Sequence, residues 1–283
     1  MGADVLIGNG TSSSASYEFS GHADFELNYG KGVYVDLRCQ GKDADGNWLA
    51  QIDPEGRDTD AVGDTLIGIV NVVGTFAMTG DTLIGNHQNN VMYGVDGDDL
   101  LVGNEGNDSL WGNDDNDTLE GGAGADLLVG ERGFDMVSYQ NASQGVRIDL
   151  RNQNNHAGQV GAPGGEENGD QFWYVDGVIG SAHDDTLIGG SVDDEAYRYA
   201  GNRLEGGAGD DLLMGLGGAD TLDGGAGSDT ADYRLSTAAV RIDLALQDGV
   251  AAQSGGAAGN DGDGDELISI ENVTGSAFND TIL

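Results

Sequence analysis

The sequence predicts an all-β fold in which short strands stack into a solenoid, and three observations support this prediction. Aspartate or asparagine recurs every nine residues between Gly80 and Tyr139 without a break in register. An apolar residue follows each of these positions two residues later, and glycines fill the segments between them. A nine-residue unit of this kind holds one short strand and one tight turn, and such units bury their apolar residues only by stacking.

The acidic positions form two rows if two units close one coil, because residues eighteen apart then lie on the same side. The first row holds Asp81, Asp99, Asp117 and Asp135, and the second holds Asn90, Asp108 and Asp126. The apolar positions point inward and form two seams, Leu83, Leu101 and Leu119 in one and Met92, Leu110 and Leu128 in the other.

The glycines and the carboxylates together indicate a cation site in the turns. Glycine lets a turn adopt positive φ, so that backbone carbonyls point at one spot. A carboxylate and several carbonyls give an oxygen-only cage, which is the ligand set of Ca²⁺. A disordered Gly/Asp-rich segment would have the same composition. The shared phase of Asp and Leu argues against disorder when calcium is present, whereas disorder is the expectation without calcium.

Residues 1–63 lie outside the nine-residue pattern and are expected to form a β-rich segment. One repeat-like strand occurs in ADVLIGN, followed by the alternating runs YEF at Tyr17, DFELNY from Asp24 and VYVDL from Val33. Such alternation is typical of short strands joined by polar turns. The run KDADGNW at 42–48 resembles the start of an EF-hand loop but lacks its glutamate, so a polar hairpin turn is favoured.

The remainder of the chain is a large internal repeat. The strings VRIDL and DDTLI or NDTIL recur at spacings of 94 and 95 residues, from Arg147 to Arg241 and from Asp185 to Asp280. The sequence therefore predicts a first array at 64–139, a β spacer at 140–184, a second array at 185–233, and a β spacer at 234–283 that leads into a truncated third array.

The second array keeps the spacing of nine through Asn202, Asp211, Asp220 and Asp229. The interval from Asp185 to Asn202 is seventeen, and we expect the inserted run at 191–201 to bulge out as a loop. Asn90 and Asn202 stand at array starts, and an uncharged amide is expected to bind Ca²⁺ more weakly than a carboxylate.

The charge balance limits the partners of the chain. It has 50 acidic and 11 basic residues, a net charge of −39, which argues against nucleic acid and against anionic membranes. No apolar window is long enough to span a bilayer, so no membrane insertion is expected. The start of the chain lacks a signal-peptide pattern, and its single cysteine excludes an internal disulfide. Carboxylates packed at this density repel one another and require a counter-cation.

Catalytic motifs are not found in the sequence. Its four histidines do not form H-E-x-x-H, and neither G-x-S-x-G nor a glycine-rich loop ending in G-K-[ST] occurs. Acidic pairs such as Asp98–Asp99 and Asp114–Asp115 belong to the turn register, which favours cation binding over acid–base catalysis. The sequence therefore predicts a module that is not an enzyme.

The repeated pattern G-G-x-G-x-D-x-U-x, in which U is a large apolar residue, resembles the RTX (repeats-in-toxin, haemolysin-type calcium-binding) family. The resemblance covers both arrays and the ends, about half of the chain, and IENVTGSAFNDTIL from Ile270 is similar to spacer segments of large bacterial RTX proteins. It implies a right-handed parallel β-roll. It also implies type I export from a Gram-negative bacterium without a cleaved N-terminal signal, and an extracellular or cell-surface location.

Carried over by position, the resemblance implies side-chain and backbone ligands for roughly eight calcium ions. The side chains are those of Asp81, Asn90, Asp99, Asp108, Asp117, Asp126, Asp135, Asp185, Asp211, Asp220, Asp229 and Asp280. The backbone oxygens are those of Gly94, Gly103, Gly112, Gly121, Gly206 and Gly215. A C-terminal export signal and the acylated-lysine region of pore-forming members are not recognisable, and both ends look like cuts in a longer protein.

The sequence thus predicts a calcium-binding β-roll module of a secreted bacterial protein that folds on Ca²⁺ outside the cell after type I secretion. One alternative is a non-catalytic part of an exported enzyme, such as a protease, a lipase or a polysaccharide-modifying epimerase. Another is an adhesin or surface-layer segment.

One face of the first array is expected to be mostly apolar, with Val91, Tyr93, Ser109, Trp111, Leu127 and Val129. Two interpretations of this face remain open. Other parts of the chain, the strands after Tyr139 or residues 10–63, cover it as internal core, or it binds a glycan, a passenger domain or a second copy through Tyr93 and Trp111.

Overall fold

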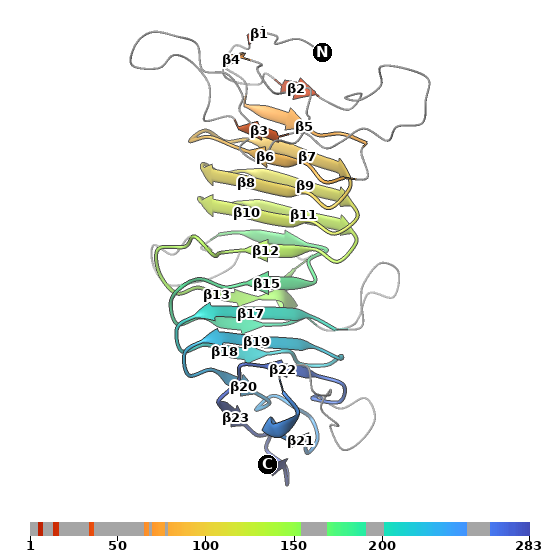
Figure 1. Cartoon of the computed structure of the whole chain (residues 1–283), viewed down its shortest axis with the longest axis vertical. Coiled ribbons are helices and arrows are strands. Elements are labelled where there is room, and N and C mark those ends of the chain that lie inside the picture. Colours follow the sequence, from red (N-terminus) through yellow and green to blue (C-terminus); the bar gives the residue numbers. More distant parts are fainter. Residues whose placement is uncertain are drawn as a thin grey trace. The chain divides into compact units, whose positions relative to one another are not determined.

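The structure is a computed structural model of the chain (Figure 1). It describes residues 5–7, 14–16, 34–36, 65–67, 70–76, 79–153, 169–190, 201–247 and 261–283. These residues form two compact units, 1–135 and 136–283, and each unit is described by itself. The regular elements in the described ranges are short strands and two 3-10 helices, and every strand pairing within a unit is parallel. The predicted all-β fold of parallel β-roll arrays is confirmed.

The first unit contains two stacks of parallel strands and one separate pair. One stack holds β3 (Tyr34–Asp36), β6 (Thr82–Ile84), β8 (Leu100–Glu105) and β10 (Thr118–Ala123). The other holds β2 (Ser14–Ser16), β5 (Asn71–Val73), β7 (Val91–Asp96), β9 (Ser109–Asp114) and β11 (Leu127–Arg132). The separate pair is β1 (Val5–Ile7) with β4 (Thr65–Ile67).

Strands of the arrays pair with the strand eighteen residues further along, so equivalent repeat positions lie side by side. Leu83 pairs with Leu101 and Leu101 with Leu119, while Met92 pairs with Leu110. These side chains are all fully buried. Because side chains alternate across a strand, the large apolar position points inward in every repeat and its neighbours point outward. Both predicted seams are confirmed.

The second unit repeats this arrangement with more irregular connections. One stack holds β12 (Met136–Ser138), β15 (Gly177–Ile179), β17 (Arg203–Ala208), β19 (Thr221–Ala226) and β22 (Glu266–Ile268). The other holds β13 (Arg147–Asp149), β16 (Thr186–Ile188), β18 (Leu212–Met214), β20 (Thr230–Asp232) and β23 (Asn272–Thr274). The further elements are β14 (Gln171–Trp173), β21 (Arg241–Ile242), β24 (Thr281–Ile282), η2 (Leu150–Asn152) and η3 (Leu244–Leu246).

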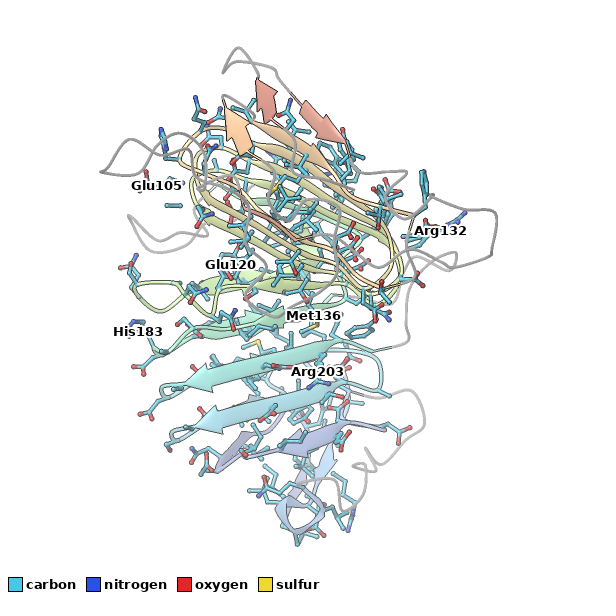
Figure 2. The ribbon with its side chains drawn as sticks, turned by 45° about the horizontal axis from the view of Figure 1, so that its top comes forward. Glu105, Glu120, Arg132, Met136, His183 and Arg203 are labelled. Carbon is cyan, nitrogen blue, oxygen red and sulfur yellow. The ribbon has the colours of Figure 1, made fainter. Side chains whose placement is uncertain are left out.

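Figure 2 shows side chains of the stack that contains β12, β15 and β17, with Met136 on β12 and Arg203 on β17. The strands approach closely where glycine faces a neighbour: a Cβ on Gly177 would collide with the sulfur of Met136 and lie 2.5 Å from the carbonyl oxygen of Arg203. Close stacking therefore requires glycine at this point of β15.

The internal repeat predicted from the sequence is present as two copies of one arrangement. The N–H of Val146 donates to Oδ1 of Asp185 at 2.7 Å, and the N–H of Val240 donates to Oδ1 of Asp280 at 2.9 Å. In the first copy, Asp149 precedes η2 and accepts from the N–H of Arg151. In the second copy, η3 begins after Asp243 in the same way.

An insertion separates two consecutive coils of the second array without displacing their strands. Asp185 and Asp211 occupy equivalent positions although they lie 26 residues apart, where other coils use eighteen. The strands that follow these two aspartates, β16 and β18, pair in register. The predicted bulge at 191–201 falls almost wholly on residues outside the described ranges.

In the N-terminal segment, the expected strands in ADVLIGN and VYVDL are confirmed by β1 and β3. The runs YEF, DFELNY and KDADGNW lie outside the described residues.

Candidate calcium-binding sites

The array aspartates form two hydrogen-bonded rows in the first unit. Each Oδ1 accepts a hydrogen bond from the backbone N–H of the equivalent residue one coil earlier. The N–H of Asp99 donates to Asp117 at 2.9 Å, and the N–H of Asn90 donates to Asp108 at 2.7 Å. The remaining links of the two rows are Asp81 to Asp99, Asp117 to Asp135 and Asp108 to Asp126. Both predicted rows are therefore confirmed.

The same ladder orders the second unit. The N–H of Asn202 donates to Oδ1 of Asp220 at 2.7 Å, and the N–H of Asp211 donates to Oδ1 of Asp229 at 2.8 Å. The aspartates lie almost wholly inside the stack, with Asp229 fully buried.

In six of the array aspartates the second carboxylate oxygen is buried and accepts no hydrogen bond. This holds for Oδ2 of Asp99, Asp108, Asp117, Asp211, Asp220 and Asp229. The Oδ2 atoms of Asp126 and Asp135 are buried as well. A buried carboxylate with one oxygen that lacks a donor is unstable as an anion unless a cation neutralises it. The ladder leaves one oxygen of each of these six aspartates available to such a cation.

A glycine five residues before each of these six aspartates keeps the space beside this oxygen open. A Cβ on Gly103 would meet Oδ2 of Asp108 and lie 2.5 Å from the carbonyl oxygen of Gly121. We call this space, where a carboxylate oxygen and a carbonyl oxygen of the next coil converge over a glycine, the cradle. A side chain at the glycine position would fill the cradle. Because glycine has none, two oxygens from different coils face one point.

Each of the six glycines expected to supply backbone oxygens points its carbonyl at a glycine of an earlier coil, beside an aspartate or, at positions 85 and 189, beside an asparagine. The carbonyl oxygens of Gly94, Gly103, Gly112, Gly121, Gly206 and Gly215 face the glycines at positions 74, 85, 94, 103, 180 and 189. Gly224 does the same at 2.7 Å from a Cβ on Gly206, beside Asp211, and was missed by the sequence analysis. Its position eighteen residues after Gly206 was the available signal.

The donor set of a cradle fits Ca²⁺ in kind. Calcium takes six to eight oxygens from carboxylates, carbonyls and water in a flexible geometry. Across the described ranges, no group of three or more His, Cys, Asp or Glu side chains could hold a metal ion together. Each cradle instead combines one carboxylate with backbone oxygens, an arrangement that suits a hard cation and offers nothing to a soft one.

Burial dominates the electrostatics of the rows. It raises the pKa of Asp117 to about 9 and that of Asp99 to about 8, from an ordinary value of 3.8. Burial likewise raises the pKa of Asp108 and Asp211 to about 7, and that of Asp220 to about 6. Neighbouring carboxylates of the same row add to the effect at Asp117. A divalent cation in the cradle would oppose it, because opposite charge favours the ionised form.

The first aspartate of each array differs from those inside it. Oδ2 of Asp81 accepts from the N–H of Thr75 at 2.6 Å, and its Oδ1 accepts from the Thr75 hydroxyl at 3.1 Å. Ser181 makes the same two bonds to Asp185, and the Ser276 hydroxyl donates to Asp280. These three expected ligands are thus bonded to protein donors, and their role as calcium ligands stays a prediction.

The two asparagines at array starts are also engaged by the protein. The amide nitrogen of Asn90 donates to the carbonyl of Val70 at 2.7 Å, while its oxygen accepts from the N–H of Asn86 at 2.8 Å. Asn202 repeats this with the carbonyl of Asp176 and the N–H of Gly190. Each amide therefore offers a cation one oxygen that already accepts a hydrogen bond, which supports the expectation of weaker binding there.

The aromatic residues of the first array stack on each other. The rings of Tyr93 and Trp111 lie 4.8 Å apart at 15°, and in the strand register Val73 and Val129 flank them. One face of each ring is therefore covered by the other ring, whereas a sugar needs an uncovered ring face on which to stack. Both rings are half-buried, and docking of a glycan, a passenger domain or a second copy stays a prediction.

None of the described segments forms a helix with the length and hydropathy needed to cross a bilayer.

Comparison with known proteins identifies the repeats. The RTX calcium-binding nonapeptide repeat matches in four copies, at residues 80–101, 102–137, 178–196 and 199–231. No curated protein matches the chain. The four copies contain Asp99, Asp108, Asp117, Asp211, Asp220 and Asp229, the six aspartates named above for their Oδ2 atoms. The fold, the oxygen cradles and this match lead to one conclusion: the chain carries RTX calcium-binding nonapeptide repeats, which here form a parallel β-roll.

Proposed function

We propose that this chain is a non-catalytic folding module of a secreted bacterial protein, which stays open at the low calcium concentration of the cytosol and folds on calcium outside the cell after type I secretion. The observation that carries the proposal is the set of buried Oδ2 atoms that accept no hydrogen bond. A fold that buries these carboxylates in their ionised form requires a cation beside them.

Two kinds of group would bind each calcium ion. An array aspartate would supply one oxygen to the ion, and a glycine carbonyl of the next coil would supply another. Calcium bound there would neutralise carboxylates and join successive coils. Roughly eight ions would offset on the order of 16 charges of the net −39. Without them, self-repulsion and a core only two seams wide favour the open chain.

The expected affinity suits a switch between compartments. Extracellular calcium modules have dissociation constants on the order of 10⁻⁴ to 10⁻³ M, far above cytosolic calcium. A module of this affinity would be open during export and closed after it.

The acidic pairs that resemble an acid–base couple have structural roles. Asp99 belongs to an inner row, while Oδ1 of its neighbour Asp98 accepts from the N–H of Asn116 at 2.9 Å. Oδ2 of Asp115 accepts from the N–H of Gly97, and Asp114 pairs with Arg132 at 3.5 Å. This supports a binding module rather than an enzyme.

Far-UV circular dichroism of the whole chain tests the proposal. In EGTA we expect a mostly coil spectrum that becomes β-sheet when millimolar Ca²⁺ is added, whereas the same concentration of Mg²⁺ should have little effect. Magnesium demands a nearly ideal octahedron and gives up its water reluctantly, which the carbonyl cradle does not suit. A β spectrum that is the same with and without calcium would overturn the proposal.

A further inference from the structure

Asp265 occupies the position of an array aspartate although it lies in the spacer at 234–283. The N–H of Asp220 donates to its Oδ1 at 3.0 Å, as each row residue does to the next. Two residues later, Leu267 pairs with Leu222 and is fully buried, as the large apolar position of a repeat is. Asp220 and Asp265 lie 45 residues apart in the sequence, whereas residues joined by this hydrogen bond within the array lie eighteen apart. Asp265 therefore ends the row that Asn202 and Asp220 begin.

The second oxygen of Asp265 is satisfied in a way that the array does not use. The hydroxyl of Tyr233 donates to Oδ2 of Asp265 at 2.8 Å, and both residues are buried, at 3% and 0% exposure. The equivalent oxygen of Asp220 accepts no hydrogen bond. A tyrosine proton thus lies at the oxygen that faces the cradle in the interior of the array.

The same pair occurs in the first copy of the internal repeat. The hydroxyl of Tyr139 donates to Oδ2 of Asp170 at 2.6 Å, and both side chains are buried. Tyr139 and Asp170 precede Tyr233 and Asp265 by 94 and 95 residues, the spacing of the repeat itself. Two copies of one contact show that it is a property of the spacer and not an accident of one turn.

We propose that Tyr233 terminates the calcium row of the second unit by placing a hydroxyl where an interior aspartate would face the cation, so that Asp265 binds no calcium, and that Tyr139 keeps calcium from Asp170 in the same way. This rests on the proposed function, since it concerns which carboxylates the ions use. The spacer then joins the row of Asp220 with a hydrogen bond in place of an ion, and the interior aspartates alone set the calcium content of the array. A hydroxyl neutralises no charge, but its hydrogen bond satisfies one carboxylate oxygen without drawing an ion into a site where the repeat pattern has ended.

Calcium content separates this proposal from a model in which Asp265 is one more ligand. The whole chain, as wild type, Asp265→Asn and Asp220→Asn, is dialysed to equilibrium against saturating Ca²⁺, and bound calcium per chain is measured. Asparagine keeps the Oδ1 acceptor in both variants, so the ladder is preserved. We expect Asp220→Asn to lose about one ion, or to hold it at least tenfold more weakly. Asp265→Asn should match the wild type. An equal loss in both variants would overturn the proposal. A wild type that binds no calcium would instead overturn the proposed function.

A double-mutant cycle tests the hydroxyl directly and does not depend on counting ions. Tyr233→Phe removes one oxygen atom, and we expect the calcium-loaded chain to unfold about 2–4 °C lower. In the Asp265→Asn background the same change should have a different effect, because the two groups are coupled. Tyr93→Phe removes the hydroxyl of the tyrosine that stacks on Trp111 and should add independently to Asp265→Asn. Additive effects for Tyr233 and Asp265 would overturn the proposal. If Asp265→Asn does not fold, the Tyr233→Phe variant alone tests the proposal, and an unchanged unfolding temperature for that variant would contradict it.

Discussion

The backbone N–H of Asp99 donates to Oδ1 of Asp117 at 2.9 Å, one coil further along, and Oδ2 of Asp117 is left buried without a donor. One carboxylate thus performs two tasks, because one oxygen sets the register between coils and the other faces a cradle. Loss of such an aspartate therefore affects both the stacking of coils and the binding of the ion.

The first prediction compares an interior aspartate with an asparagine at an array start. Asp117→Ala should lower calcium binding by at least one ion per chain, because it removes both a ligand and a row link. Asn90→Ala should have a smaller effect, since the Asn90 amide already bonds Val70 and Asn86. Isothermal titration of both variants decides between them, and a greater loss for Asn90→Ala would contradict the row model.

The second prediction concerns the cradle itself. Gly103→Ala should weaken the adjacent calcium site at least tenfold, about 1.4 kcal/mol, because its Cβ would lie 2.5 Å from the carbonyl oxygen of Gly121 and against Asp108. Gly217→Ala is the matched control, because the nearest heavy atom to its Cβ, Oδ1 of Asp261, would lie 4.0 Å away. Calcium titrations followed by circular dichroism give both midpoints. Equal midpoints for the two variants would show that the space beside Gly103 is not part of a site.

The third prediction is a pH dependence of the metal-free chain. Burial raises the pKa of Asp99 to about 8 and that of Asp117 to about 9, above the unfolded value of 3.8. Between about pH 4 and pH 9 the folded chain therefore holds more protons than the unfolded chain, so its stability falls as pH rises. We expect the metal-free chain to gain β structure as the pH is lowered from 9 to 5.

Calcium should reverse this trend, because an ion must displace the protons that the buried carboxylates hold. The calcium affinity should rise with pH over the same window. Circular dichroism across this range, with metal-free and calcium-saturated protein, checks both statements. More β structure at pH 9 than at pH 5 without metal would contradict the expected sign.

The fourth prediction addresses the aromatic pair. Trp111→Ser should destabilise the calcium-loaded chain, because it removes a stacked partner of Tyr93 worth about 0.5–1.5 kcal/mol beyond the area buried. Phe76→Ser, at a residue that is 53% exposed, is the control and should change the stability little. Thermal unfolding and sedimentation in calcium separate the two interpretations of this face. Unchanged stability with loss of self-association or glycan binding would favour a docking surface.

The nine-residue period of the sequence determined most of the β-roll. It placed Asp99 and Asp117 in one row, and Leu101 and Leu119 in one seam, because each unit is a local strand and turn that stacks on an identical neighbour. The chemistry followed from the same period, since a carboxylate and turn carbonyls repeated in phase leave few alternatives to a calcium cage.

The tertiary structure alone decided which carboxylate oxygens lack donors. Asp220 and Asp265 take equivalent places in one row, yet only Asp265 accepts a tyrosine hydroxyl. In sequence, Asp265 follows Tyr233 by 32 residues, which is not a multiple of nine, so the array period does not connect them. A repeat pattern specifies contacts that every coil makes alike, whereas the contacts at the ends of a row depend on the path of the intervening chain, which only the folded backbone determines.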